Sequence, residues 1–226
     1  MKRPVGMKIS HPHPWTTSVA EAKAIQDQLR GCVITEDQLK AVHSVAGVDV
    51  GFDRAGKLSR AAVAILDFPT LAIKEQTIAV TPTRFPYIPG LLSFREIPAI
   101  LEALAQLADW PDLLLCDGQG IAHPRRLGLA AHLGVLIDLP SIGVAKKRLV
   151  GSHGPVPNER GQWVGLKHEG ETVGAVLRTR VGVKPIYVSP GHRISLPTAI
   201  DFVMRCTTRF RLPETTRAAH RLASGS

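Results

Sequence analysis

The pattern of apolar positions divides the first half of the chain into β-like segments followed by a helix. Residues 43–52 (HSVAGVDVGF), 60–68 (RAAVAILDF) and 71–81 (LAIKEQTIAVT) are rich in apolar and β-branched residues, and only "PT" separates the last two. Such runs predict strands, and the short connection predicts a hairpin. Helical spacing then begins at Ser93 in "SFREIPAILEALAQLA". The chain therefore opens with three antiparallel strands and a helix.

The second half continues the alternation of strands and helices. An α/β domain with a mixed sheet is the simplest arrangement for this order, and we predict one domain over residues 1–226. Two helices are expected at the C-terminus, from Ser195 and from Pro213. Further strands are predicted in 112–120 (DLLLCDGQG), 141–149 (SIGVAKKRL), 171–180 (ETVGAVLRTR) and 184–192 (KPIYVSPGH), with a helix in 127–138 (LGLAAHLGVLID).

Charge adds information that the pattern lacks. The 226 residues include 28 Lys and Arg against 19 Asp and Glu, so the formal net charge is +9. A positive field of this size favours a polyanionic partner such as nucleic acid. The three cysteines show neither disulfide nor zinc-site spacing, the first residues contain no apolar signal-peptide core, and no apolar run reaches the ~18 residues of a membrane span. The sequence predicts a cytoplasmic protein with no membrane contact.

Three carboxylates point to metal chemistry. Asp49 and Asp117 each close an apolar strand beside glycine, and Glu96 lies in the first turn of the helix that begins at Ser93. A carboxylate buried without a partner is costly, and a divalent cation can satisfy several such groups at once. Hard oxygen ligands indicate Mg²⁺, with Mn²⁺ as a substitute. The alternatives are turn-forming aspartates and a capping box between Ser93 and Glu96.

Four longer motifs carry a family resemblance. The segments "GVDVGF", "PYIPGLLSFRE", "CDGQGIAHPRRLGLAAHLGVLIDLPSIGVAKKRL" and "YVSPGHRISL" resemble, in the same order, the motifs of endonuclease V, the deoxyinosine 3′ endonuclease family of nucleic-acid repair. The resemblance implies an RNase H-like fold, with a mixed five-stranded sheet whose first three strands are antiparallel and with helices flanking it. It also implies cleavage of the second phosphodiester bond 3′ to hypoxanthine, leaving a 3′-hydroxyl and a 5′-phosphate.

The resemblance also assigns catalytic roles. Asp49 and Asp117 are expected to be metal ligands, with Glu96 as the third acidic member. His192, in "SPGHR", is expected to complete the site as a ligand or a proton-transfer group. Lys146, in "GVAKKRL", is expected near the scissile phosphate.

A stiff aromatic turn precedes the helix of Glu96. Prolines on both sides of Tyr87 and Ile88 restrict the backbone and hold these side chains on a rigid tip. An apolar tip of this kind can enter a base stack and fill the space of an extruded base, whereas the alternative is a turn whose tyrosine packs on the core. The predicted wedge consists of Tyr87, Ile88, Pro89 and Gly90.

A pocket for the extruded base needs backbone close to the base edge. The resemblance places this pocket in "DGQGIAHPRRLG", where glycines allow close approach and a histidine can stack or contact phosphate. The residues concerned are Gly118, Gly120, His123 and Gly128.

Two other functions compete with a nuclease. "GQG" after a strand, with Asp138 twenty residues beyond Gly118, approaches the dinucleotide-binding fingerprint, although His123 stands where the third glycine belongs. A non-catalytic binding module would use the positive charge without the carboxylates.

For the nuclease, the expected partner is DNA containing deoxyinosine, and inosine in RNA is a second candidate substrate. The expected oligomeric state is a monomer.

Overall fold

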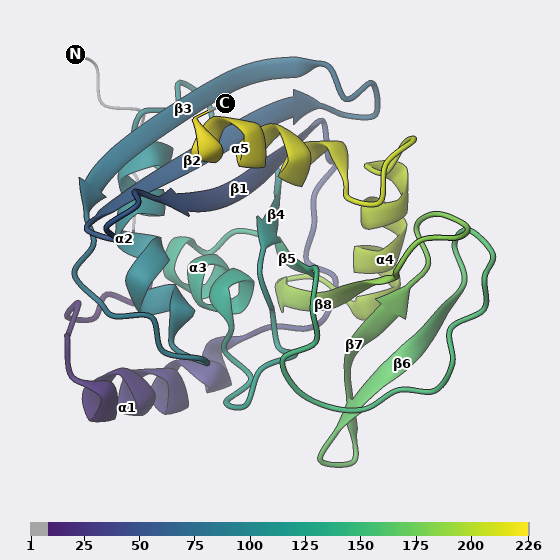
Figure 1. Ribbon diagram of the computed structural model, residues 1–226, viewed down its shortest axis with the longest axis horizontal. Helices are drawn as coiled ribbons and strands as arrows, with labels where there is room; N and C mark the ends of the chain where they lie inside the picture. Colours follow the sequence, from purple (N-terminus) through teal and green to yellow (C-terminus); the bar gives the residue numbers. More distant parts are fainter. Residues whose placement is uncertain (1–8, 226) are drawn as a thin grey trace.

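The structure is a computed structural model that describes residues 9–225. It consists of one mixed β-sheet with helices on both faces (Figure 1). The prediction that the first residues form no signal peptide falls partly on residues 1–8, which lie outside the described residues. The helices are α1 (Val19–Leu29), the 3-10 turn η1 (Arg30–Cys32), α2 (Leu92–Leu104), α3 (Leu129–Ile137), α4 (Leu196–Arg205) and α5 (Glu214–Ser224). The strands are β1 (Ser44–Phe52), β2 (Leu58–Asp67), β3 (Ile73–Pro82), β4 (Leu113–Asp117), β5 (Ser141–Ala145), β6 (Trp163–His168), β7 (Glu171–Leu177) and β8 (Ile186–His192).

The strand order across the sheet is β3-β2-β1-β4-β5-β8-β7-β6. The first three strands are antiparallel, as the sequence predicts, and β2 and β3 form the expected hairpin. β1, β4 and β5 are mutually parallel, so their C-terminal ends lie at one edge of the sheet. In open α/β sheets such an edge is where ligands collect.

Over residues 9–225, the sheet has eight strands, not the five that the resemblance implied. The expected five are present as β3-β2-β1-β4-β5, but β8 pairs antiparallel with β5, and β7 and β6 extend the sheet further. Strand β6 was not predicted, because only Leu166 among its six residues is buried and the segment lacks an apolar pattern. Its pairing with β7 creates the strand.

Two helical layers bury the two faces of the sheet. On one face, α2 and α3 pack against alternate residues of β1, β2 and β4, such as Val48, Val63 and Cys116. On the other face, α4 and α5 cover residues of the opposite parity, such as Val45 and Leu115. The alternation of side chains along each strand is the reason that one sheet serves two cores. Among the described residues, no helix combines the length and apolar character needed to cross a bilayer.

Two glycines on β1 let α5 approach the sheet at backbone distance. A Cβ added at Gly47 would lie 1.9 Å from the carbonyl oxygen of Thr215, and one at Gly51 would lie 2.4 Å from that of Ala223. Asp49 lies between these glycines on the same face of the strand, because side chains repeat every two residues. The absent side chains therefore allow α5 to lie directly over Asp49.

Candidate active site

Asp49 lies on β1 beneath α5. Its side chain is 13% exposed, and its Oδ2 is 2.7 Å from Nδ1 of His220, a residue of α5. The other carboxylate oxygen, Oδ1, accepts a hydrogen bond from the amide of Val50 at 2.8 Å. The carboxylate is thus held by one strand and one helix.

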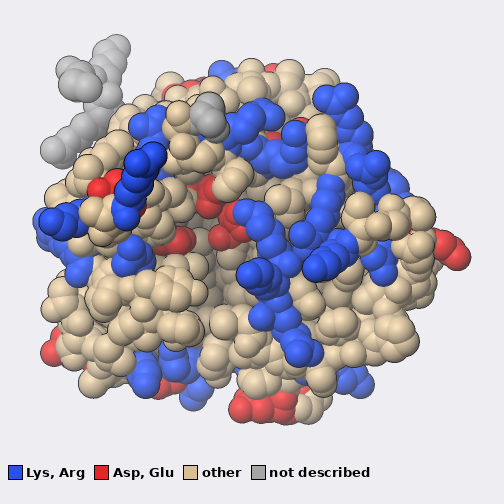
Figure 2. All heavy atoms as spheres, in the orientation of Figure 1, with Lys and Arg blue, Asp and Glu red and all other residues tan. Residues whose placement is uncertain are grey.

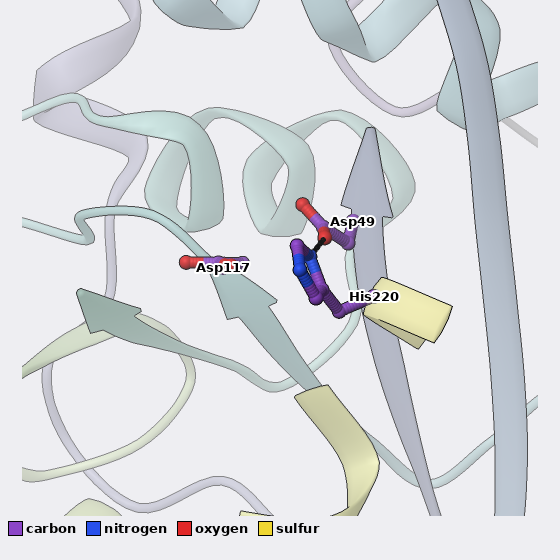
Figure 3. A group of neighbouring side chains, drawn as sticks. All are labelled: Asp49, Asp117 and His220. Carbon is purple, nitrogen blue, oxygen red and sulfur yellow. Dashed lines mark hydrogen bonds and ion pairs between the residues drawn. The ribbon is translucent and has the colours of Figure 1, made fainter. Parts of the chain in front are cut away.

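Asp117 ends β4, the strand beside β1. The parallel pairing of Val48 with Cys116 brings Asp117 next to Asp49. One potential ligand atom from each of Asp49, Asp117 and His220 lies within 4.8 Å of the other two, and Figure 3 shows these three side chains converging from two strands and a helix. Lys146, just beyond β5, donates from Nζ to Oδ2 of Asp117 at 2.5 Å. The parallel strands therefore bring the predicted aspartates and lysine together.

Glu96, on α2, is not one of the three residues whose ligand atoms lie within 4.8 Å of one another, but it lies close enough for the charges of Asp49 and Asp117 to affect it. It is 7% exposed, and its pKa is raised well above the ordinary value by burial and then by the charges of Asp49 and Asp117. The pKa of Asp117 is raised as well, by burial and by Asp49, with Lys146 opposing the shift. The charge of Asp49 raises the pKa of both Glu96 and Asp117. A divalent cation would stabilise such a site, and the carboxylate oxygens fit Mg²⁺ or Mn²⁺.

The capping-box alternative for Glu96 is wrong. Helix α2 begins at Leu92, and its N-terminal cap, Leu91, makes no side-chain cap hydrogen bond. The hydroxyl of Ser93 lies 2.9 Å from Nδ1 of the buried His132 and does not cap the helix. Ser93 and Glu96 therefore form no capping box, and the charges that act on the Glu96 carboxyl are those of Asp49 and Asp117.

We expect the Glu96→Gln variant to be more stable than the parent protein when no divalent cation is added. The pKa of Glu96 is higher in the folded than in the unfolded chain, so the ionised carboxylate costs stability as the pH rises above the unfolded value. Removing that charge should raise the free energy of unfolding by about 1–2 kcal/mol, measured by urea denaturation at neutral pH with a chelator.

Glu102→Gln is the matched control, because Glu102 is exposed on the same helix. Mg²⁺ should stabilise the parent and the control more than Glu96→Gln. A Glu96→Gln protein that is less stable than the parent would contradict the repulsion described above.

The structure does not bring His192 to the carboxylates, which corrects the sequence-based expectation. His192 ends β8, which runs antiparallel to β5 and places it opposite Ser141, at the start of β5. Asp117 and Lys146 lie at the other end of that strand pair. Nε2 of His192 is 3.2 Å from Oδ1 of Asp138, and Nδ1 accepts from the amide of Ile34 at 3.3 Å. His192 therefore links Asp138 and Ile34 at the end of the β5–β8 pair that lies away from the carboxylates.

The histidine at the carboxylates is His220, which sequence reasoning missed. Its helix, "ETTRAAHRLAS", has small side chains at Thr215, Ala218, Ala219 and Ala223 that are buried on the sheet. The signal lay in "GVDVG", where two glycines flank Asp49 at alternate positions and predict a closely packed element above it. Nothing in the sequence says which helix provides that element.

A cavity of about 340 Å³ lies beside the acidic cluster. Gly118, next to Asp117, and Lys147, next to Lys146, line it, so the cavity and the carboxylates share chain segments. Tyr87 stands at the cavity with 71% of its surface exposed, which rules out the alternative of a tyrosine packed on the core. The predicted substrate-binding residues that line the cavity are Tyr87, Ile88, Pro89, Gly90, Gly118, His123 and Gly128.

Gly120 is not among the residues that line this cavity. A Cβ at this position would lie 1.9 Å from the carbonyl oxygen of Pro190, and the amide of Gly120 donates to Oγ of Ser189 at 2.8 Å. The glycine is needed for the close contact between its loop and β8.

The dinucleotide fingerprint is also not formed. Helix α3 begins only at Leu129, so no helix N-terminus follows "GQG" directly. The carboxylate of Asp138 is engaged by Arg193, with Nε to Oδ1 at 2.7 Å and Nη2 to Oδ2 at 2.8 Å. Neither the phosphate-binding turn nor the ribose-binding acid of that fingerprint is present in this geometry.

Positive charge surrounds the acidic cluster. Figure 2 shows acidic side chains near the centre of one face, with lysine and arginine side chains bordering them. Arg211 fixes the backbone of this region, donating from Nη2 to the carbonyl oxygens of Lys146 at 3.0 Å and Pro185 at 2.8 Å. The arrangement suits a polyanion that passes over the carboxylates.

Burial holds three histidines in the neutral form. Burial is the largest cause of a lowered pKa at His123, to about 4, at His132 and at His192. Because the folded pKa lies below the unfolded value near 6.5, their contribution to stability is complete above that pH and is lost as the pH falls below it. The expected loss approaches about 1.4 kcal/mol per pH unit for each histidine.

This acid sensitivity is best measured in the Glu96→Gln protein, because Glu96 titrates in the opposite sense. Urea denaturation at pH 7 and pH 5 should give a lower free energy of unfolding at pH 5. Equal values at the two pH values would show that the histidines contribute no more than Asp117, whose raised pKa acts in the opposite sense.

The order of the first five sheet positions and the acidic cluster at the ends of parallel strands define an RNase H-like α/β protein. A family model described as Endonuclease V matches residues 27–221, and the chain belongs to that family of endonucleases. The chain is 63% identical over 219 residues to "Endonuclease V" of Nostoc sp. strain PCC 7120, covering 96% of this chain and 99% of the relative.

Solved structures of endonuclease V proteins are also similar to this chain. The crystal structure of endonuclease V from Streptomyces avermitilis matches with a TM-score of 0.90 and 44% identity over 96% of each chain. Ciona intestinalis endonuclease V, solved in complex with a 23mer DNA containing an inosine followed by a ribo-adenosine, matches with a TM-score of 0.80 and 28% identity, covering 92% of this chain and 95% of that one.

Proposed function

We propose that this chain, acting as a single-domain monomer, recognises deoxyinosine in DNA and cleaves the second phosphodiester bond on its 3′ side. The products would be a 3′-hydroxyl and a 5′-phosphate, with the hypoxanthine base left in place. The observation that carries the proposal is the group of Asp49, Asp117 and His220 beside a cavity large enough for a base. The buried Glu96, whose pKa the two aspartates raise, adds a third carboxyl group. Membership of the endonuclease V family and the inosine-containing DNA bound by the Ciona relative support it.

Asp49 and Asp117 would hold the cation, with Glu96 as the third acidic group. The cation expected is Mg²⁺, with Mn²⁺ as a substitute, because carboxylate oxygens suit both. When bound, it would supply a Lewis acid that neutralises the phosphate and lowers the pKa of water. The raised pKa of Glu96 fits this assignment, since a nearby cation would reverse the shift.

Two basic side chains would act on the reacting phosphate. Lys146, held by Asp117 at 2.5 Å, would place its ammonium where negative charge increases during the displacement. His220 is held by Asp49 through Nδ1, so its Nε2 would exchange a proton with the attacking water or the leaving oxygen. In this proposal, His220 has the role that the sequence analysis expected of His192.

The lesion would enter the cavity as an extruded base. Tyr87 at the mouth would occupy the gap in the stack, and unstacking costs least at a mispaired base, which favours hypoxanthine. The glycines Gly90, Gly118 and Gly128 line the cavity and would let the base edge approach the backbone closely. Inosine in RNA is proposed as a second substrate. Contacts to the ribose 2′-hydroxyl beside the lesion would decide whether the protein accepts RNA as well as DNA.

The test is incubation of the purified protein with a labelled strand that contains one deoxyinosine, with Mg²⁺ and with chelator. A single nick at the second phosphodiester bond 3′ to the lesion, seen only with Mg²⁺, is the expected result. Binding to the strand without any metal-dependent nick would overturn the proposal in favour of a binding module. Parallel reactions with inosine RNA and with undamaged DNA establish the substrate range.

A further inference from the structure

The carbonyl oxygen of Gly90, at the end of the "PYIPG" wedge, accepts three side-chain hydrogen bonds. Its donors are Nε2 of Gln26 at 3.1 Å, Nε2 of His123 at 2.9 Å and Nη2 of Arg125 at 2.8 Å. A carbonyl oxygen has two lone pairs, so three donors exceed its ordinary capacity. Gly90 has φ +78°, a conformation that disfavours other residues and turns this carbonyl inward.

Gln26 joins this carbonyl to the segment 123–128, in which His123 and Gly128 line the cavity. It lies on α1, is completely buried, and donates from Nε2 to the carbonyl oxygen of Leu127 at 3.1 Å as well as to Gly90. Its Oε1 accepts from Nε of Arg125 at 2.6 Å. One amide group therefore contacts both the wedge and the segment 123–128.

His123 fits the same network in only one tautomer. Its Nδ1 accepts from the amide of Arg125 at 3.1 Å, so Nε2 carries the proton that is donated to Gly90. Both Gly90 and His123 line the cavity, whereas Gln26 lies behind them and does not. The amide of Gln26 thus sets the position of cavity residues without reaching the cavity itself.

We propose that Gln26 is a positioning residue for lesion recognition. Through Gly90 and Arg125 it holds the wedge at a set distance from the segment 123–128, and that distance determines how closely the cavity fits an extruded base. This inference rests on the proposed function, since it assumes that the cavity receives the base. No direct contact between Gln26 and nucleic acid is part of the proposal.

The test compares Gln26→Leu with the parent protein. Affinities for a deoxyinosine strand and for the matching undamaged strand are measured in chelator, where no cleavage occurs. The ratio of the two affinities should fall by about tenfold in Gln26→Leu, through weaker binding of the lesion strand. In single-turnover nicking, the half-saturating protein concentration should rise by a larger factor than the maximal rate falls.

Thr77→Val is the matched control for the loss of a buried hydrogen bond. Thr77 donates to the carbonyl oxygen of Ala103 at 2.9 Å, between β3 and α2 and away from the residues that line the cavity. Thermal unfolding reports the stability cost of both variants. The inference is overturned if Gln26→Leu loses stability as Thr77→Val does but keeps the parent's affinity ratio.

A second variant covers the case in which Gln26→Leu does not fold. Arg125→Lys keeps the charge at a half-buried position but cannot bridge Oε1 of Gln26 and the carbonyl of Gly90 in the same way. The same fall in the affinity ratio is expected, and an unchanged ratio would overturn the inference. A parent protein that shows no preference for deoxyinosine would instead refute the proposed function, so the two failures are distinguishable.

Discussion

The Asp117→Asn variant is expected to lose Mg²⁺-dependent incision of a deoxyinosine strand by about a thousandfold or more. The substitution keeps the size of the side chain but removes one of the charges that hold the cation, and cation stabilisation of a phosphoryl transition state is worth several kcal/mol. It also removes the ion pair with Lys146, whose Nζ lies 2.5 Å from Oδ2 of Asp117. Single-turnover nicking at saturating protein measures the loss.

Lesion binding separates a catalytic defect from a structural one. In chelator, Asp117→Asn should bind the deoxyinosine strand within about threefold of the parent, because the cavity is intact and one repelling charge is gone. Asp201→Asn is the control, since Asp201 is an exposed residue of α4 whose carboxylate pairs with Arg205. Incision by Asp117→Asn at the parent's rate would remove Asp117 from the metal site.

The second large effect is expected at His220. The His220→Ala variant should lose incision by about a hundredfold, because an imidazole that exchanges a proton in the transition state contributes a factor of this order. The loss of its contact with Asp49 should cost little stability, since the His220 side chain is 56% exposed. Single-turnover rates in Mg²⁺, measured beside thermal unfolding, separate the two effects.

His192→Ala tests the correction made by the structure. His192 is 3% exposed and bridges Asp138 and the backbone of Ile34, so its removal should lower the free energy of unfolding by about 1–3 kcal/mol. The incision rate of the folded variant should stay within about threefold of the parent. The reverse pattern, with activity lost at His192 and kept at His220, would return His192 to the site.

Features that depend on neighbouring residues were readable from the sequence. Apolar runs end at Asp49 and Asp117, and a carboxylate that closes a buried strand is visible as a pattern of neighbouring letters. The rigid turn around Tyr87 was readable for the same reason, because proline restricts its own backbone wherever it occurs. The first three strands and the helix of Glu96 follow from local periodicity.

Features that depend on packing between distant segments were not readable. His220 reaches Asp49 because Gly47 and Gly51 have no side chains and α5 can pack closely on β1. A sequence shows these glycines but does not show which element packs against them. His192 had an equally suggestive setting beside Gly191, but the antiparallel pairing of β8 with β5 carries it to the opposite edge. The antiparallel direction of β8 is therefore the reason that His192 lies away from the carboxylates.

The amino-acid sequence by itself determined the family, the acidic strand endings and the rigid turn around Tyr87, since each is encoded in contiguous motifs. Only the tertiary structure decided the eight-stranded extent of the sheet over the described residues, the histidine at the carboxylates and the contacts of Gln26 behind the cavity. The physical reason is that strand pairing and helix packing are set by contacts across the whole chain. A buried amide such as Gln26 looks like any polar helix residue until its partners, more than sixty positions away, are in place.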